Sequence, residues 1–314
     1  MEKLIVSSSP HFHSRVRTKN IMLDVIIALI PAAIAAIVLY GIKAALIIAV
    51  CVATSVTTEF FFNIICKKPQ TVGDLSAIVT GLLLALSLST KVTLWQCMVG
   101  TTFAIIVVKC LFGGIGCNFA NPAVTARVFL LIAFGKVAGG VATNFQAPEL
   151  VASATPLDVI KSGEGVLPTL TDMLIGNRGG AIGEGCAIAL ILGFVYLLIR
   201  QIISWHTPIA YIATVFVLSL IIKQDLTVAL YQVLGGGLLI GAIFMATDYS
   251  TTPSNKYGKL IFGLACGIIT VLIRLWGYYP EGVSFAILFM NILTPYIDRL
   301  CKPKPLGAGG GKNA

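Results

Sequence analysis

The chain has 314 residues, of which 57% are hydrophobic and only 11% are charged, and its mean hydropathy is +0.94. A soluble domain carries roughly 25% charged residues, so this composition excludes a soluble globular protein and predicts a polytopic membrane protein. The net charge of +9 does not indicate nucleic-acid binding, because the basic residues are spread over many short connections and are not interleaved with aromatic side chains.

The chain begins with a polar and basic stretch, residues 1–20, before the first apolar run. A secretory signal would reach its apolar core sooner and would end at a small-residue cleavage site, so we expect an uncleaved cytoplasmic segment. Ten apolar segments follow, and several are shorter than the roughly 20 residues that cross a bilayer as a helix. The ten expected segments are 21–40, 43–66, 75–89, 92–112, 119–135, 185–203, 207–222, 227–246, 257–276 and 282–299.

The distribution of Lys and Arg predicts how these segments are oriented. With the N-terminus in the cytoplasm, fourteen basic residues fall on the cytoplasmic side and seven on the outer side, although the outer side includes the longest connection. The positive-inside rule therefore predicts that both termini are cytoplasmic. The 49-residue connection Lys136–Glu184 then lies outside, and its five acidic and three basic residues agree with that location.

Two stretches, 81–129 and 241–293, share one order of features. Each has a glycine-led apolar segment, a Ser/Thr-rich break, a long helix ending in Lys109 or Arg274, a Gly/Pro-rich turn and an apolar segment with an asparagine. Five spans precede the second half, so the two halves have opposite orientations. We expect an all-α polytopic membrane protein with about ten transmembrane helices in an inverted 5+5 repeat, whose site lies where broken helices meet. The expected regions are a cytoplasmic segment 1–20, repeats 21–135 and 185–300, an extracytoplasmic loop 136–184 and a disordered cytoplasmic tail 301–314.

Glu59 lies inside an apolar segment, and Asn63 follows one turn later on the same helical face. A charge within a membrane span is costly and is by default a functional hypothesis, which makes Glu59 a candidate for ion coupling. The alternative is that Glu59 lies near the inner interface and pairs with Lys67 or Lys68.

Three further polar residues lie at or near segment ends. Asn121 precedes Pro122 where a segment starts, and the free N–H groups of that helix start would meet an anion or a flavin edge, or else belong to a capped, broken helix. Arg127 would reach a phosphate or pair with an acid. Asp248, followed by hydroxyl residues, would place a carboxylate at the inner mouth of the second repeat or form an ordinary turn.

Cysteine and histidine give no sign of a metal site in this chain alone. The eight cysteines contain no CxxC pair and lie mostly in or beside apolar spans, which is typical of small buried hydrophobes, although a partner chain could share a site. No metal-ligand spacing joins the three histidines, and we expect them at the surface. The residues are Cys51, Cys66, Cys97, Cys110, Cys117, Cys186, Cys266 and Cys301, and His11, His13 and His206.

Three strings in this order, GGIGCNFANPAVTARV, ASATPLDVIKSGEG and FMATDYSTTP followed by GVSFAILFMNILTPYIDR, resemble the RnfD/NqrB family. The match is closer to the RnfD members, the D subunits of the Rnf complex, and covers the chain from about Pro10 to Arg299. The resemblance implies a subunit of an ion-translocating ferredoxin:NAD⁺ oxidoreductase of the bacterial cell membrane. This chain has no G-x-G-x-x-G after a strand, so we expect the NAD site on another subunit.

The resemblance also implies a covalent FMN, joined through its phosphate to a threonine hydroxyl by a separate flavin transferase. The family pattern resembles Asp-x-x-(Ser/Thr)-Gly-Ala-Thr, often followed by Pro-Leu. Here residues 149–157 read Glu-Leu-Val-Ala-Ser-Ala-Thr-Pro-Leu. Ala154 and Thr155 match, whereas Glu149, Ala152 and Ser153 depart from the pattern. Thr155 is thus the expected acceptor, on an outer loop that a second enzyme can engage.

The family further implies the A, B, C, E and G subunits as partners, besides membrane lipid. It implies a possible second, non-covalent flavin such as riboflavin between the spans, which we expect near Asn121 and Asp248. Two other functions remain open: a non-redox channel or transporter with a fold like that of urea transporters, and a scaffold for redox partners that binds no flavin. The motif at Thr155 distinguishes the flavin-bearing subunit from a channel, because a channel without redox chemistry has no use for a flavin-attachment motif.

Overall fold

The computed structural model describes residues 17–135, 155–162, 167–176, 178–277, 279 and 281–301. The secondary structure of these residues is entirely helical. Among the described residues, five helices are long and apolar enough to cross a membrane, a sixth candidate is a bent pair, and four shorter apolar helices have 10–17 residues. Each of the ten expected apolar segments matches one of these, which confirms an all-α polytopic membrane protein.

The first half of the bundle consists of five apolar elements. Gly41, with a φ of 69°, separates the first two helices, which need a sharp reversal there. Asn121 caps the last helix, and Pro122 occupies its first position, where a missing N–H costs nothing. The five elements are α1 (Thr18–Tyr40), α2 (Ile42–Ile65), α3 (Ser76–Ser87), α4 (Leu94–Phe103) with its π-helical continuation η2 (Ala104–Cys110), and α5 (Pro122–Phe134). The 3₁₀ turn η1 (Val72–Asp74) precedes α3.

The second half repeats this order, after two short helices and a 3₁₀ turn. Its third segment is broken at Gly235–Gly237, where the chain bends by 58° and two glycines have φ near +65° (+64° and +67°). The connecting elements are α6 (Pro156–Ser162), α7 (Leu170–Ile175) and η4 (Ile182–Glu184). The second half comprises α8 (Ala187–Ile199), α9 (His206–Lys223), α10 (Leu226–Leu234), α11 (Leu238–Ile240) with the π-helical η5 (Gly241–Met245), α12 (Lys256–Trp276) and α13 (Val283–Leu300).

The packing of the two halves agrees with the inverted repeat. In the first half α2 packs against α3 and α4, and in the second half α9 packs against α10 and α12. The halves meet through equivalent helices, α1 against α8 and α5 against α13. Close approach relies on small residues: a Cβ on Gly193 of α8 would lie 2.4 Å from the Ala28 carbonyl oxygen of α1.

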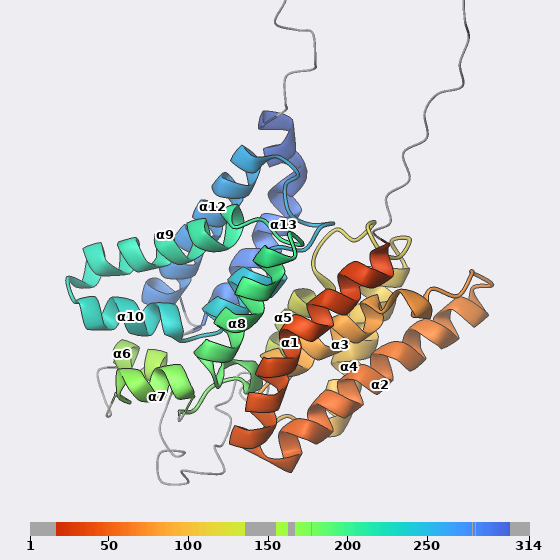
Figure 1. The fold of residues 1–314 in the computed structure, drawn as a ribbon, viewed down its shortest axis with the longest axis horizontal. Coiled ribbons are helices and arrows are strands. Elements are labelled where there is room, and N and C mark those ends of the chain that lie inside the picture. Colours follow the sequence, from red (N-terminus) through yellow and green to blue (C-terminus); the bar gives the residue numbers. More distant parts are fainter. Residues whose placement is uncertain are drawn as a thin grey trace, which may run out of the picture.

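The bundle has two distinct ends (Figure 1). The first turn of α1 and the last turn of α13 lie at one end, which we call the terminal face. The short helices α6 and α7 lie at the opposite end, which we call the loop face, and the Tyr40 hydroxyl at the end of α1 donates to the Arg178 carbonyl there at 3.3 Å.

Three basic residues that the charge count assigns to the two membrane surfaces are buried. Lys109 lies in η2 at 2% exposure, Arg274 lies in the last turn of α12 at 3%, and Arg178 precedes η4 at 4%. Their long side chains turn inward because buried hydrogen-bond acceptors are available there. A buried basic residue says little about which side of the membrane it faces. Without these three residues, thirteen basic residues remain on the expected cytoplasmic side and five on the outer side, so the positive-inside rule predicts the same orientation.

Candidate functional site

Thr155 immediately precedes helix α6 on the loop face. Its hydroxyl donates to Asp158 Oδ2 at 2.7 Å and accepts from the Asp158 backbone N–H at 3.1 Å, and its own N–H donates to Asp158 Oδ2 at 3.2 Å. This is the reciprocal pattern of a capping box, and Pro156 suits the first helical position. Thr155 is 9% exposed, so its hydroxyl is a helix cap and not a freely accessible loop group. Ser153 and Ala154 lie outside the described residues.

Helix α6 is docked onto the break between α10 and α11. Leu157 is 4% exposed, and a Cβ on Gly236 would lie only 2.4 Å from its Cδ1 atom. Lys161 donates from its amino group to the Gly277 carbonyl oxygen at the end of α12. The candidate flavin-bearing segment is therefore fixed to the broken helix of the second repeat through Leu157 and to the end of α12 through Lys161.

Two arginines hold the carbonyl groups that the helix break leaves free. Arg274 donates to Gln232 Oε1 at 3.0 Å and to the Gly235 carbonyl oxygen at 3.1 Å. Arg178 donates to the Leu234 carbonyl oxygen at 2.7 Å and to that of Glu184 at 3.1 Å. Carbonyls at the end of a helix need such partners when they are buried, so these arginines make the break a built feature of the fold.

A buried carboxyl group lies behind this break. Glu184 Oε1 has no hydrogen-bond partner among the described residues, and a Cβ on Gly237 would lie 2.9 Å from it. Burial, and then the negative charge of Glu281, raise the pKa of Glu184 to about 7 against the opposing effect of Arg178, Arg127 and Arg274. The Glu184 carboxyl group therefore titrates near neutral pH.

Arg127 forms an ion pair with Glu281 that joins the two repeats. Arg127 lies on α5, whereas Glu281 immediately precedes the turn into α13. Of the two expected roles, the structure shows Arg127 paired with an acid. Arg127 lies on the loop-face side of the bundle and does not line the cavity near the terminal face.

A cavity of about 400 Å³ lies between the two repeats toward the terminal face. The structure brings Asn121 and Asp248 together in its wall. Asn121 caps α5 and also donates to the Met245 carbonyl oxygen of η5 at 3.2 Å, and Asp248 Oδ2 accepts from the Ser250 and Thr251 hydroxyls at 3.1 and 3.2 Å. The lining residues are Thr18, Ile21, Met22, Val25, Ser76, Val79, Thr80, Leu83, Lys109, Ile115, Gly116, Asn118, Asn121, Pro122, Leu197, Ile202, Ile203, Phe244, Thr247, Asp248, Tyr249 and Ser250.

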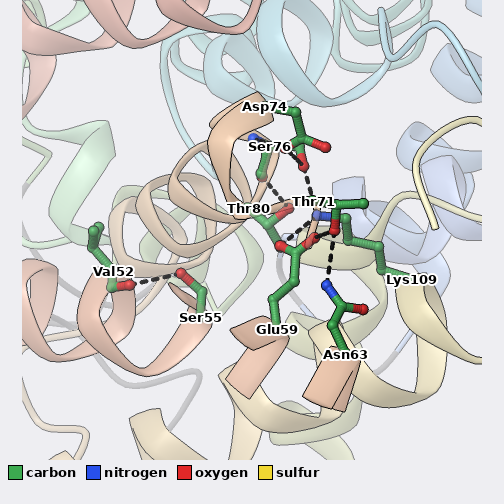
Figure 2. A network of polar contacts seen from close by, with 9 residues as sticks. All are labelled: Val52, Ser55, Glu59, Asn63, Thr71, Asp74, Ser76, Thr80 and Lys109. Carbon is green, nitrogen blue, oxygen red and sulfur yellow. Dashed lines mark hydrogen bonds and ion pairs between the residues drawn. The ribbon is translucent and has the colours of Figure 1, made fainter. Parts of the chain in front are cut away.

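Glu59 lies in the polar network of Figure 2, in which Ser76, Thr80 and Lys109 also line this cavity. Its Oε2 atom is 2.8 Å from Lys109 Nζ, and its Oε1 atom accepts from the Thr71 hydroxyl at 2.6 Å. Glu59 is 1% exposed. The expected alternative was that Glu59 pairs with Lys67 or Lys68, but its partner is Lys109. Lys68 instead donates to the Cys110 carbonyl oxygen at 3.3 Å. The Glu59–Lys109 ion pair is buried inside the bundle.

The sequence gives no sign of a metal site among the cysteine and histidine side chains. Among the described residues, no group of three or more His, Cys, Asp or Glu side chains could hold a metal ion. The cysteines there are free thiols, and Cys51, Cys97, Cys110 and Cys266 are buried. His206 is half-buried beside Trp205. His11 and His13 lie outside the described residues.

The fold and these sites define a class: helical membrane proteins of two inverted halves, with a cavity between the halves and a broken helix at the opposite end. Comparison with known proteins then gives the family. The sequence model of the NQR2, RnfD, RnfE family matches residues 5–307, and the chain belongs to this family.

Curated relatives cover nearly the whole chain. The chain is 44% identical to the D subunit of the Na⁺-translocating ferredoxin:NAD⁺ oxidoreductase complex of Acetobacterium woodii, over 97% of this chain and 95% of the relative. It is 37% identical to the D subunit of the proton-translocating ferredoxin:NAD⁺ oxidoreductase complex of Clostridium ljungdahlii, over 96% of both. It is 34% identical to the D subunit of the ion-translocating oxidoreductase complex of Stutzerimonas stutzeri, over 92% of both.

Proposed function

We propose that this chain is the flavin-bearing membrane subunit of a redox-driven ion pump, which passes electrons between reduced ferredoxin and NAD⁺ with coupled Na⁺ or H⁺ transport. Its relatives are named as D subunits of such complexes. In this proposal FMN is attached covalently to Thr155, and the NAD site lies on another subunit. The relatives' names favour this function over a non-redox channel or a scaffold.

The proposal rests mainly on the structural position of Thr155, in a chain that belongs to this family. The residue immediately precedes α6 on the loop face, outside the membrane-crossing helices, and α6 is anchored to the bundle. Lys161, Lys223 and Arg274 line a small pocket of about 60 Å³ beside α6, and these cationic side chains suit the negative charge of a phosphodiester. When bound, FMN supplies one- and two-electron redox chemistry.

A second, non-covalent flavin such as riboflavin fits the cavity near the terminal face. About 400 Å³ lies within the roughly 300–1,000 Å³ of ligand pockets. Apolar side chains of α1 and α3 form much of its wall, and Lys109, Asn118 and Asp248 provide polar groups. Such a mixture of apolar walls and a few placed donors and acceptors suits a flat, largely aromatic ligand.

The proposed orientation follows the positive-inside rule. The terminal face, with both chain ends, is cytoplasmic in the bacterial cell membrane, and the loop face with Thr155 is outside. The A, B, C, E and G subunits of the complex would be the protein partners, and a flavin transferase would attach the FMN. Both repeats expose large apolar side chains, such as Ile42 at 75% and Ile199 at 76%, which suit lipid or a partner's membrane helices.

Covalent attachment is tested on a denaturing gel. After co-expression with the flavin transferase, the denatured wild-type chain is expected to give a fluorescent band under ultraviolet light, and Thr155→Ala is expected to give none. Thr169→Ala is the matched control, because Thr169 caps α7 through the same arrangement with Asp172 and its band should persist. A dark wild-type band, with a transferase that labels another substrate, would refute the proposal.

Glu59 is the proposed ion-coupling residue, because a buried carboxylate between helices is a ready cation site. Glu59→Gln is expected to slow Na⁺-dependent turnover of the assembled complex while the flavin on Thr155 is retained. Turnover at a series of Na⁺ concentrations measures this. Unchanged Na⁺ dependence and rate would leave Glu59 with a purely structural role in the network.

A further inference from the structure

Lys109 stands between a buried acid and a ligand-sized cavity. Its amino group contacts Glu59 Oε2 at 2.8 Å on one side and Ser76 Oγ at 2.5 Å on the other. Lys109 and Ser76 both line the cavity, whereas Glu59 and its second partner Thr71 do not. Figure 2 shows Lys109 reaching between these groups from its own helical segment. Glu59 therefore does not reach the cavity itself, but it is hydrogen-bonded to Lys109, which does.

The Lys109 ammonium group has three protons to donate, and the contacts with Glu59 and Ser76 use two of them. A ligand in the cavity with a carbonyl oxygen or a ring nitrogen near Lys109 would accept a third bond or replace one of the existing two. In a buried site a charge-assisted hydrogen bond is strong, because little water competes for the charge. Any bond that pulls Lys109 toward the cavity weakens its contact with Glu59.

The Asp74 side chain holds Ser76, the partner of Lys109 on the cavity side, in place. Asp74 Oδ1 accepts from the Ser76 backbone N–H at 2.8 Å and also from the Ser76 hydroxyl. The Ser76 hydroxyl thus has its proton committed to Asp74 and offers Lys109 only a lone pair. This makes Ser76 a neutral and replaceable acceptor for Lys109, in contrast with the Glu59 carboxylate on the other side.

We propose that Lys109 is shared between Glu59 and a planar, acceptor-bearing ligand in the cavity, so that the ligand and Glu59 compete for one cation. This rests on the cavity flavin of the proposed function and adds how its binding is regulated. Competition of this kind is reciprocal: a ligand that draws Lys109 away leaves Glu59 as a buried, unpaired carboxylate, which then attracts Na⁺ or a proton. A cation bound at Glu59 in turn releases Lys109 to the ligand.

The test measures binding of riboflavin, from the quenching of its fluorescence, to the purified full-length chain made without the flavin transferase. Glu59→Gln removes the competitor, so riboflavin is expected to bind at least about tenfold more tightly, the worth of one charge-assisted hydrogen bond. In the double variant Glu59→Gln with Lys109→Met this gain is expected to be lost, because Lys109 mediates it. The double variant removes both buried charges, which avoids leaving one unpaired.

Asp24→Asn is the matched control. Asp24 pairs with Arg200 at 3.1 Å on the α1–α8 contact and does not line the cavity, so its removal should leave the riboflavin affinity unchanged. Equal affinity of the wild type and Glu59→Gln would overturn the inference, and so would a gain that survives in the double variant. If neither the wild type nor Glu59→Gln binds riboflavin, the cavity flavin itself is refuted.

Discussion

Lys109→Met is expected to lower the free energy of unfolding by about 3–5 kcal/mol, the usual cost of removing one partner from a buried ion pair. Glu59 would keep only the Thr71 hydroxyl as a donor in a site that is almost closed to solvent. A carboxylate in such a site is strongly unfavourable when no cation neutralises it. Unfolding in SDS, followed by the fluorescence of the chain's three tryptophans, measures the change.

The double variant with Glu59→Gln separates charge from packing. Removing both charges is expected to restore most of the lost stability, because well-packed neutral side chains replace a buried ion pair at little cost. If Lys109→Met is as stable as the wild type to within about 1 kcal/mol, the Glu59–Lys109 contact does not behave as a desolvated ion pair. The network in Figure 2 would then not be held together by its charges.

Gly236→Ala is expected to destabilise the protein strongly. Gly236 has a φ of +64°, which costs a residue with a Cβ roughly 1–2 kcal/mol, and the new Cβ would lie 2.4 Å from Leu157 Cδ1 and 2.7 Å from Arg274 Nη2. The substitution therefore displaces both the anchor of α6 and the arginine that holds the helix break. We expect a loss of stability clearly greater than the backbone strain alone.

Gly114→Ala is the control for that strain. Gly114 also has a positive φ, of +95°, but a Cβ there would meet nothing within 4 Å. The same SDS unfolding measurement on the two variants isolates the effect of displacing Leu157 and Arg274. Equal stability of Gly236→Ala and Gly114→Ala would show that α6 is not packed against the break as described.

The sequence predicts the helices well and the side-chain partners poorly. Each expected apolar segment corresponds to a helix, with ends that differ by a few residues, because the length of an apolar run directly reports burial in lipid. The break at 235–237 lies inside one expected segment, 227–246, and its three consecutive glycines are a signal that could have located it. Asn121 and Asp248 line one cavity in the structure, and the second flavin that the resemblance implies there stays a prediction.

The residues whose burial the sequence does not predict have distant partners. Lys109 pairs with a residue 50 positions away, and Arg274 binds Gln232 at a separation of 42, so no local pattern reveals that either is buried. A charge at the end of an apolar segment instead suggests a position at the membrane surface. Asp158 was also missed as a partner of Thr155, although Thr followed by Asp three residues later has the spacing of a capping box, here the start of α6.

The capping of α6 has a consequence for the proposed modification. The Thr155 hydroxyl donates its only proton to Asp158, and a threonine esterified to a phosphate has no such proton. Attachment of FMN would therefore remove that bond and place a phosphodiester near a carboxylate. Leu157 and Lys161 are independent anchors, so we expect α6 to remain docked when the cap is changed.

The most direct test of the central claim is to locate the flavin within the chain. The protein is purified after co-expression with the flavin transferase and digested, and the fluorescent peptide is sequenced by mass spectrometry. We predict a single flavin-bearing peptide that contains Thr155 and carries the mass of FMN less one water on that residue. A flavin on Thr169 or any other residue, or a digest in which the Thr155 peptide is recovered only unmodified, would contradict the proposed attachment.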